Sequence, residues 1–125
     1  MIYGIGTDIV RISRIDTAFK RWGNRFLRRV FTEAEIEYCN KKTHPASHLA
    51  LRFAAKEAFV KAIGLGFRNG ISFRQIEVVH THNGSPALKL HNKSKDFSKQ
   101  HGIERSFLSL SDDGDYAIAM VVLEV

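Results

Sequence analysis

The stretch RFAAKEAFVKAIGLG, residues 52–66, decides the fold that the sequence predicts. It forms most of an alanine-rich segment, 46–63, that is typical of a helix and is followed by Gly64, a residue favoured just after a helix end. Side chains four residues apart are neighbours on a helix surface. Glu57 and Lys61 should therefore lie side by side on this helix.

Strands are predicted on both sides of this helix. Residues 2–10 are apolar and β-branched, and Gly4 and Gly6 within them indicate close approach of another backbone or a ligand. The predicted elements after the helix are strands at 71–81 and 86–91, a short helix at 93–101, and strands at 105–111 and 116–124. The sequence thus predicts the α+β class, with a mainly antiparallel sheet packed with helices in a single domain, 1–125.

Further helices are predicted between the first strand and the alanine-rich helix. Residues 12–28 carry an apolar stripe at helical spacing, and Gly23 and Asn24 indicate that one helix ends and a second begins there. Thr32 and Glu35 have the spacing of a capping box, which predicts a short helix starting at this point.

Composition excludes several classes of protein. A chain of 125 residues with 44% apolar and 26% charged residues fits one globular domain, and no apolar run reaches the roughly 18 residues of a membrane span. The start lacks the basic region of a signal peptide, and the single cysteine, Cys39, excludes a disulfide framework or a cysteine-rich zinc site. We therefore expect a cytoplasmic protein with no membrane partner. The 19 Lys and Arg residues against 13 Asp and Glu favour an anionic partner.

Two carboxylates are candidates for a metal site. Asp8 follows the glycine-rich strand and Glu57 lies in the alanine-rich helix, and Mg²⁺ prefers one or two carboxylates plus waters and phosphate oxygens. Alternatively, Asp8 caps the following helix and Glu57 pairs with Lys61. Lys56 and Lys61 flank Glu57 and could neutralise charge on a metal-bound pyrophosphate, or they could be solvated.

Arginines recur at helical spacing along residues 12–28, and clustered cations favour an acidic partner, although a solvated face is an open alternative. The four that share this stripe are Arg14, Arg21, Arg25 and Arg28. The loop 64–70 contains three glycines that could bring backbone N–H groups to a phosphate, but it matches no nucleotide-binding fingerprint.

Four segments carry a resemblance to a known family: GIGTDIVRISRI (4–15), FTEAE (31–35), RFAAKEAFVKAIGLG (52–66) and NGSPAL (83–88). In this order they resemble the bacterial holo-[acyl-carrier-protein] synthases, the small 4′-phosphopantetheinyl transferases, over nearly the whole chain. The resemblance implies that family's fold and symmetric homotrimers with active sites between subunits. It also implies transfer of the phosphopantetheine arm of coenzyme A to a serine of acyl carrier protein, with Mg²⁺, in fatty acid biosynthesis. Adenosine 3′,5′-bisphosphate is the other product.

The resemblance assigns roles to individual residues. Asp8 and Glu57 would hold the ion, Lys61 would face the pyrophosphate, and Glu57, alone or through a metal-bound water, would accept the serine proton. The four arginines would dock the acidic acyl carrier protein. Contacts with coenzyme A are expected from Lys56, Lys61, Gly64, Gly66, Pro86 and Ser109.

Two positions depart from the family pattern. Many members carry a histidine before and after a Ser-x-Ser/Thr strand, where this chain has Phe107 and Asp112. Phe107 cannot make the polar contact of a histidine, so the contacts with the coenzyme near the C-terminus are expected to differ.

Two other functions are open on the sequence. A small nucleic-acid-binding protein is supported only by the net charge and the arginines, and no known nucleic-acid-binding motif is present. A relative that binds acyl carrier protein without modifying it is the second. The presence of Asp8, Glu57 and Lys61 favours the transferase, and no nucleic-acid partner is expected.

Overall fold

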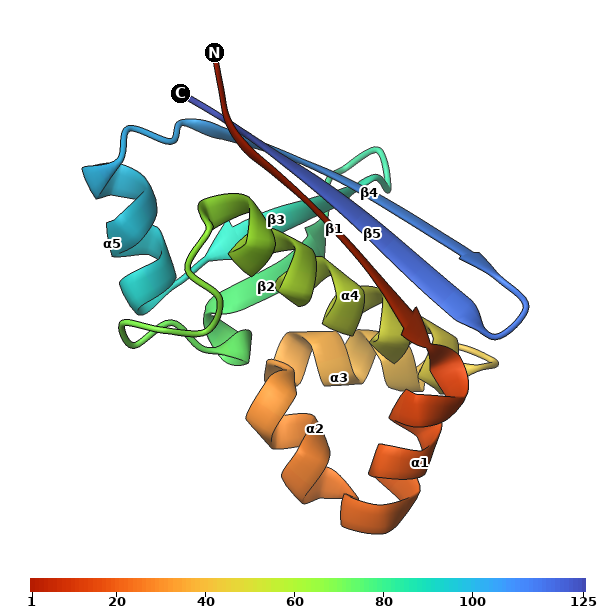
Figure 1. The fold of residues 1–125 in the computed structure, drawn as a ribbon. Coiled ribbons are helices and arrows are strands. Elements are labelled where there is room, and N and C mark those ends of the chain that lie inside the picture. Colours follow the sequence, from red (N-terminus) through yellow and green to blue (C-terminus); the bar gives the residue numbers. More distant parts are fainter.

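The computed structural model describes residues 1–125 as two antiparallel sheets with helices packed around a central helix (Figure 1). The elements are α4 (Pro45–Ile63) at the centre, a sheet in the order β1 (Ile2–Arg11), β5 (Tyr116–Glu124), β4 (Arg105–Asp113), and a second sheet of β2 (Ile76–His80) and β3 (Pro86–Leu90). The predicted α+β class with antiparallel pairing is confirmed.

The remaining helices are α1 (Ile12–Trp22), α2 (Asn24–Val30), α3 (Glu33–Asn40) and α5 (Asn92–Gln100). Gly23, with φ of 59°, separates α1 from α2 as predicted. The capping box of α3 is also confirmed, because the Glu35 amide donates to Thr32 Oγ1 and the Thr32 amide donates to Glu35 Oε1.

The first residues of the strand predicted at 71–81 are not a strand. Residues Phe73–Gln75 form a short 3₁₀ helix, and β2 begins only at Ile76. The Phe73 ring packs against Phe53 and Phe67, with ring centroids 5.4 and 4.0 Å away. At this point the chain packs an aromatic side chain instead of pairing with a neighbouring strand. The pattern of residues in the sequence does not reveal this difference.

The contact between β1 and α4 depends on two glycines. A Cβ atom at Gly6 would lie 1.9 Å from the carbonyl oxygen of Ala58, and one at Gly4 would lie 2.0 Å from that of Ala62. The group that approaches these glycines is therefore the backbone of α4. Any side chain larger than a hydrogen atom at Gly4 or Gly6 would clash with it. Alternation along β1 then turns Asp8, two residues after Gly6, toward the same helix.

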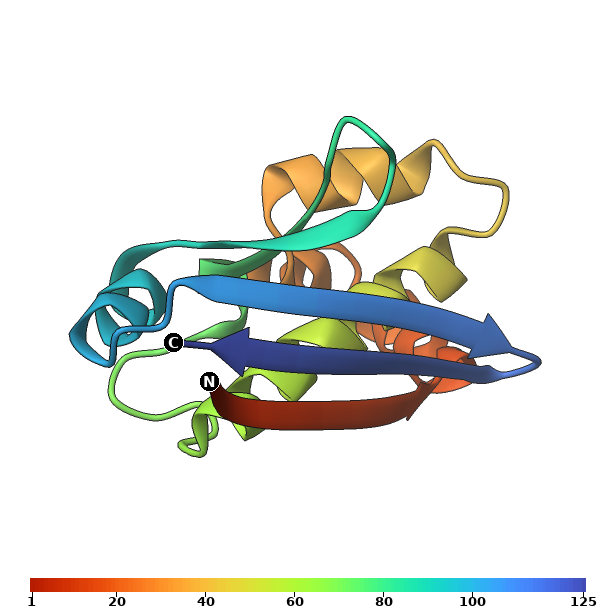
Figure 2. The same ribbon diagram turned by 90° about the horizontal axis from the view of Figure 1, so that it is seen from above.

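One face of the three-stranded sheet packs on α4, and the other is uncovered (Figure 2). Residues of the packed face, such as Ala119 and Val121 on β5, are fully buried. The uncovered face carries large apolar side chains that are about half exposed: Ile5, Ile9, Phe107, Ile118 and Met120. We call these five residues the outer apolar face. None of the helices combines the length and the apolar character that crossing a membrane requires.

Candidate active site

Asp8 on β1 and Lys61 on α4 form an ion pair at the edge of the first sheet. Lys61 Nζ lies 3.0 Å from Asp8 Oδ1 and donates a second hydrogen bond of 3.0 Å to the carbonyl oxygen of Thr7. The Asp8 side chain is only 16% exposed, whereas that of Lys61 is 54% exposed. Asp8 does not cap the following helix, since the N-cap residue of α1 is Arg11.

Glu57 completes an acidic pair with Asp8. Its pKa is raised above the ordinary value, first because burial disfavours the charged form and second because the charge of Asp8 lies nearby. The charges of Lys61 and Arg14 act in the opposite direction. The structure thus brings Asp8, Glu57, Lys61 and Arg14 into one electrostatic group, drawn from β1, α1 and α4.

This group fits a divalent cation. Two partly buried carboxylates that repel each other gain from an ion placed between them, and carboxylate oxygens are the ligands that Mg²⁺ prefers. No cluster of three or more His, Cys, Asp or Glu side chains exists that could enclose an ion. An ion held here would keep positions open for waters and phosphate oxygens, as Mg²⁺ does in phosphoryl-transfer sites.

Lys56 lies outside this group, contrary to the sequence interpretation. Its side chain is fully buried, and Nζ donates to Glu35 Oε1 at 2.8 Å, to the Ile76 carbonyl at 2.6 Å and to the Phe73 carbonyl at 3.1 Å. All three ammonium protons are therefore used inside the protein. Lys56 is therefore a core residue whose ammonium is enclosed by the protein, although its neighbour in sequence, Glu57, faces the acidic pair.

The glycines after α4 cap the helix. The Gly64 amide donates to the carbonyls of Val60 and Lys61, and the Gly66 amide donates to that of Val60. Both glycines have positive φ, which is typical of a helix C-terminus of this kind. These two amides already have backbone acceptors in the structure, and a contact of either glycine with the coenzyme stays a prediction.

Pro86 and Ser109 also lie apart from the acidic pair within one chain. Pro86 begins β3 in the second sheet, opposite His80. Ser109 is exposed on β4, opposite Met120 of the outer apolar face. Phe107 belongs to that face as well, and 51% of its side chain is exposed. A contact of Ser109 with a ligand bound at Asp8 would need the outer face of another subunit.

The arginines do not form one continuous stripe. The guanidinium of Arg14 lies 6.0 Å from the ring centroid of Phe53 on α4, beside the acidic pair. Beyond the break at Gly23, Arg28 turns to Glu33, with Nε 3.7 Å from Oε1. The other two arginines of the predicted stripe, Arg21 and Arg25, lie around one aromatic side chain.

That aromatic side chain is Trp22, which is 52% exposed at the end of α1. The guanidinium of Arg21 lies 4.9 Å from its ring centroid. Arg25 and Arg29 line a shallow groove of about 280 Å³ together with Trp22 and Phe26. Helical spacing counted across Gly23 could not identify Arg29, because the register restarts there. We call Arg21, Trp22, Arg25, Phe26 and Arg29 the Trp22 surface.

A second cationic group, which we call the Tyr38 group, surrounds Tyr38 and is not evident in the sequence. The Arg52 guanidinium lies 4.4 Å and the Lys42 ammonium 4.6 Å from the Tyr38 ring centroid, and His80 stacks on the same ring at 4.5 Å. The pKa values of His48 and His80 are lowered, mainly by burial and then by the charge of Arg52. Arg52 is 2% exposed and its Nε has no hydrogen-bond partner. Such a group is suited to an anion.

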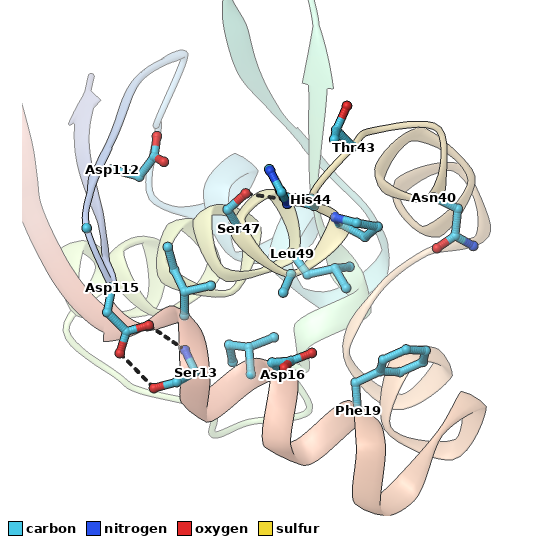
Figure 3. A pocket seen from close by; sticks show the side chains of 15 residues that line it. Ser13, Asp16, Phe19, Asn40, Thr43, His44, Ser47, Leu49, Asp112 and Asp115 are labelled. Atoms are coloured by element: carbon cyan, nitrogen blue, oxygen red, sulfur yellow. Dashed lines mark hydrogen bonds between the residues drawn. The ribbon is translucent and has the colours of Figure 1, made fainter.

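A cavity of about 690 Å³ is lined neither by this cationic group nor by the acidic pair (Figure 3). It is bounded by α1, the N-terminus of α4 and the turn between β4 and β5, and Asp16, His44, Asp112 and Asp115 line it. A smaller hollow of about 200 Å³ contains Asp8 and Lys61 together with Ile118 of the outer apolar face. Chemistry therefore favours the smaller hollow, although the larger one has more room.

Comparison with known proteins identifies the family of this chain. The family model described as the 4′-phosphopantetheinyl transferase superfamily matches residues 4–121. The chain belongs to this superfamily. A holo-[acyl-carrier-protein] synthase of Geobacter sp. (strain M21) is 50% identical to it over 124 residues, which cover 99% of both chains.

Solved structures of phosphopantetheinyl transferases share the fold. A holo-[acyl-carrier-protein] synthase from Neisseria meningitidis is 42% identical, with a TM-score of 0.93 and 100% of both chains covered. The enzyme from Helicobacter pylori, solved in complex with coenzyme A, is 36% identical with a TM-score of 0.85, over 96% of this chain and 99% of that one. The predicted family resemblance is confirmed.

Proposed function

We propose that this chain is a holo-[acyl-carrier-protein] synthase that transfers phosphopantetheine from coenzyme A to a serine of acyl carrier protein. The observation that carries the proposal is the group formed by Asp8, Glu57 and Lys61 in a member of the transferase superfamily. The two carboxylates could hold a Mg²⁺ ion, and that ion and the exposed ammonium of Lys61 could together neutralise a pyrophosphate. The buried, unpaired thiol of Cys39 is compatible with the reducing cytoplasm, where we place the activity.

The acidic pair and Lys61 have separate tasks in this reaction. Mg²⁺ held by Asp8 and Glu57 would draw electron density from the phosphate oxygens and make phosphorus more electrophilic. Lys61, held by Asp8 and the Thr7 carbonyl, has one further Nζ proton to present to the pyrophosphate. The serine oxygen forms a bond to phosphorus while the bond to adenosine 3′,5′-bisphosphate breaks. Glu57, alone or through a metal-bound water, would accept the serine proton.

The proposal includes a homotrimer with the active site at the subunit boundary. The outer apolar face exposes five large apolar side chains on one flat sheet surface, which monomeric proteins rarely do. The hollow at Asp8 and Lys61 also contains Ile118 of that face. A neighbouring subunit packed there would bury the apolar side chains and could bring its Ser109 to the coenzyme.

The Tyr38 group gives the coenzyme a second anchor in this proposal. The product adenosine 3′,5′-bisphosphate carries a phosphate that is not part of the reacting pyrophosphate. Arg52 and Lys42 supply concentrated positive charge around the Tyr38 ring. Pro86, a predicted contact of the coenzyme, pairs with His80 in β2–β3, which supports binding of part of the coenzyme beside this group.

The decisive experiment mixes the protein with apo-acyl carrier protein, coenzyme A and Mg²⁺ and follows the carrier protein by mass spectrometry. A phosphopantetheine adduct that requires all three additions supports the proposal. An unchanged carrier protein, with the enzyme shown to be folded, rejects it. Retention on duplex DNA in the absence of transfer would instead support the nucleic-acid-binding alternative.

Lys61→Ala is expected to lower kcat about a hundred-fold or to raise the KM for coenzyme A, with little change in the KM for carrier protein. The reason is that the Lys61 ammonium is placed at the acidic pair and not on the Trp22 surface. Lys41→Ala is a matched control, since Lys41 forms an exposed ion pair with Glu37 on another helix. A rise confined to the KM for carrier protein would move Lys61 to the docking surface.

Arg21→Glu is expected to raise the KM for carrier protein about ten-fold, with a smaller change in kcat, because reversing one charge at the Trp22 surface replaces attraction by repulsion. The KM of the unchanged enzyme should also rise with ionic strength, since salt screens such charges over about 8 Å. Lys99→Glu on α5 is the control, because α5 lies at the other end of the molecule (Figure 1). A KM that responds to neither change would show that these arginines are only solvated.

A further inference from the structure

The N-terminus of α1 has no cap of its own. The N-cap residue Arg11 makes no side-chain hydrogen bond to the helix, and the first turn contains no acidic residue. β1 continues directly into α1, so no loop residue is present to accept hydrogen bonds from the free amides of the first turn.

Asp115, which is 102 residues away from Ser13, supplies this cap (Figure 3). Its Oδ1 accepts from the Ser13 amide at 2.9 Å, its Oδ2 accepts from Ser13 Oγ at 2.7 Å, and its carbonyl oxygen accepts from the Ile12 amide at 2.7 Å. Asp115 lies in the turn between β4 and β5, just after Gly114. The hydrogen bonds from Ser13 lower the pKa of Asp115, so it is an acceptor at neutral pH.

The cap determines where the first turn of α1 points. Arg14 follows Ser13 directly, and its guanidinium lies 6.0 Å from the Phe53 ring centroid. Its positive charge acts to lower the pKa of Glu57. Ile15, in the same turn, is 2% exposed. Further along, the same helix ends at the Trp22 surface. A change in the direction of the first turn of α1 would therefore move the proposed docking surface relative to the acidic pair.

We propose that Asp115 is a positioning residue for acyl carrier protein, acting through α1. It ties the turn between β4 and β5 to the first turn of α1, and so holds Arg14 and the Trp22 surface in the orientation that an incoming carrier protein meets. This inference rests on the proposed function. Asp115 itself touches neither the acidic pair nor any reacting atom.

Asp115→Ala is expected to raise the KM for carrier protein about five-fold, the ratio that loss of one typical N-cap corresponds to. The KM for coenzyme A and kcat should stay within about two-fold, because the acidic pair is not altered. Asp115→Asn keeps an acceptor for the Ser13 amide and should restore most of the KM. Asp113→Ala is the matched control and should behave like the unchanged enzyme, because Asp113 ends β4 beside the same turn and its side chain makes no hydrogen bond.

A double-mutant cycle with Ser13→Ala tests the contact itself. Ser13→Ala and Asp115→Ala should be non-additive in the KM for carrier protein, because both remove the same hydrogen bond. A lower melting temperature for Asp115→Ala with an unchanged KM for carrier protein would overturn the inference, as would an equal rise in both KM values. Failure of the proposed function is distinct, because the unchanged enzyme would then form no adduct.

Discussion

Asp8→Asn and Glu57→Gln are each expected to lower the rate of phosphopantetheine transfer by about a thousand-fold while the protein stays folded. A metal ion that stabilises developing charge contributes several kcal/mol, and about 4 kcal/mol corresponds to that factor. Each substitution leaves one carboxylate for an ion that has no other side-chain ligand of the usual kinds nearby. The fold should persist because neither side chain belongs to the buried core.

The measurement is the rate of adduct formation by mass spectrometry over a range of Mg²⁺ concentrations. Chelation should abolish the activity of the unchanged enzyme, and added Mg²⁺ should restore it. Asp16→Asn and Glu37→Gln are matched controls, because both carboxylates belong to exposed ion pairs on other helices. Near-normal turnover of either active-site variant at low Mg²⁺ would show that the acidic pair does not hold the ion.

The elements that the sequence predicts well are those whose signals are local. The capping box at Thr32 and the helix stop at Gly64 each depend on a few neighbouring residues, and both are present in the structure. Gly4 and Gly6 indicated a close approach, and only the structure shows that the partner is α4. The acidic pair follows from that contact, because it lies where β1 meets the helix.

The features that the sequence did not reveal depend on contacts between distant segments. The cap of α1 by Asp115 joins residues 102 positions apart, and the Tyr38 group gathers side chains from three elements. The predicted stripe of arginines is not continuous for a different reason: Gly23 ends α1, so the helical register starts again in α2. Asp112 lines the cavity of about 690 Å³, and its charge opposes the lowering of the His48 pKa.

Lys56 shows why periodicity alone could not divide the two sides of α4. The helix is apolar on nearly all sides, so its residues give no clear polar face. Lys56 and Glu57 are adjacent in sequence and appear equivalent as charged residues. In the structure one is buried with Glu35 between α3 and β2, and the other faces Asp8.

Lys56→Met is therefore expected to lower the free energy of unfolding by about 3–5 kcal/mol, the usual cost of removing one partner of a buried ion pair. Glu35 would keep a buried carboxylate with only the amides of Thr32 and Val78 as partners. The same substitution at exposed Lys61 is the control and should cost less than about 1 kcal/mol. Urea unfolding of the three proteins measures the difference.

A second substitution separates the structural role of Lys56 from a role in binding the coenzyme. Glu35→Gln in the Lys56→Met background removes the uncompensated charge and keeps an acceptor for one amide, so it should recover part of the lost stability. The folded double variant should bind coenzyme A with a KM close to that of the unchanged enzyme, because Lys56 Nζ is enclosed by Glu35, Phe73 and Ile76. A stable double variant with a raised KM for coenzyme A would return Lys56 to the active site, and a Lys56→Met protein as stable as the original would show that the ion pair contributes nothing to the fold.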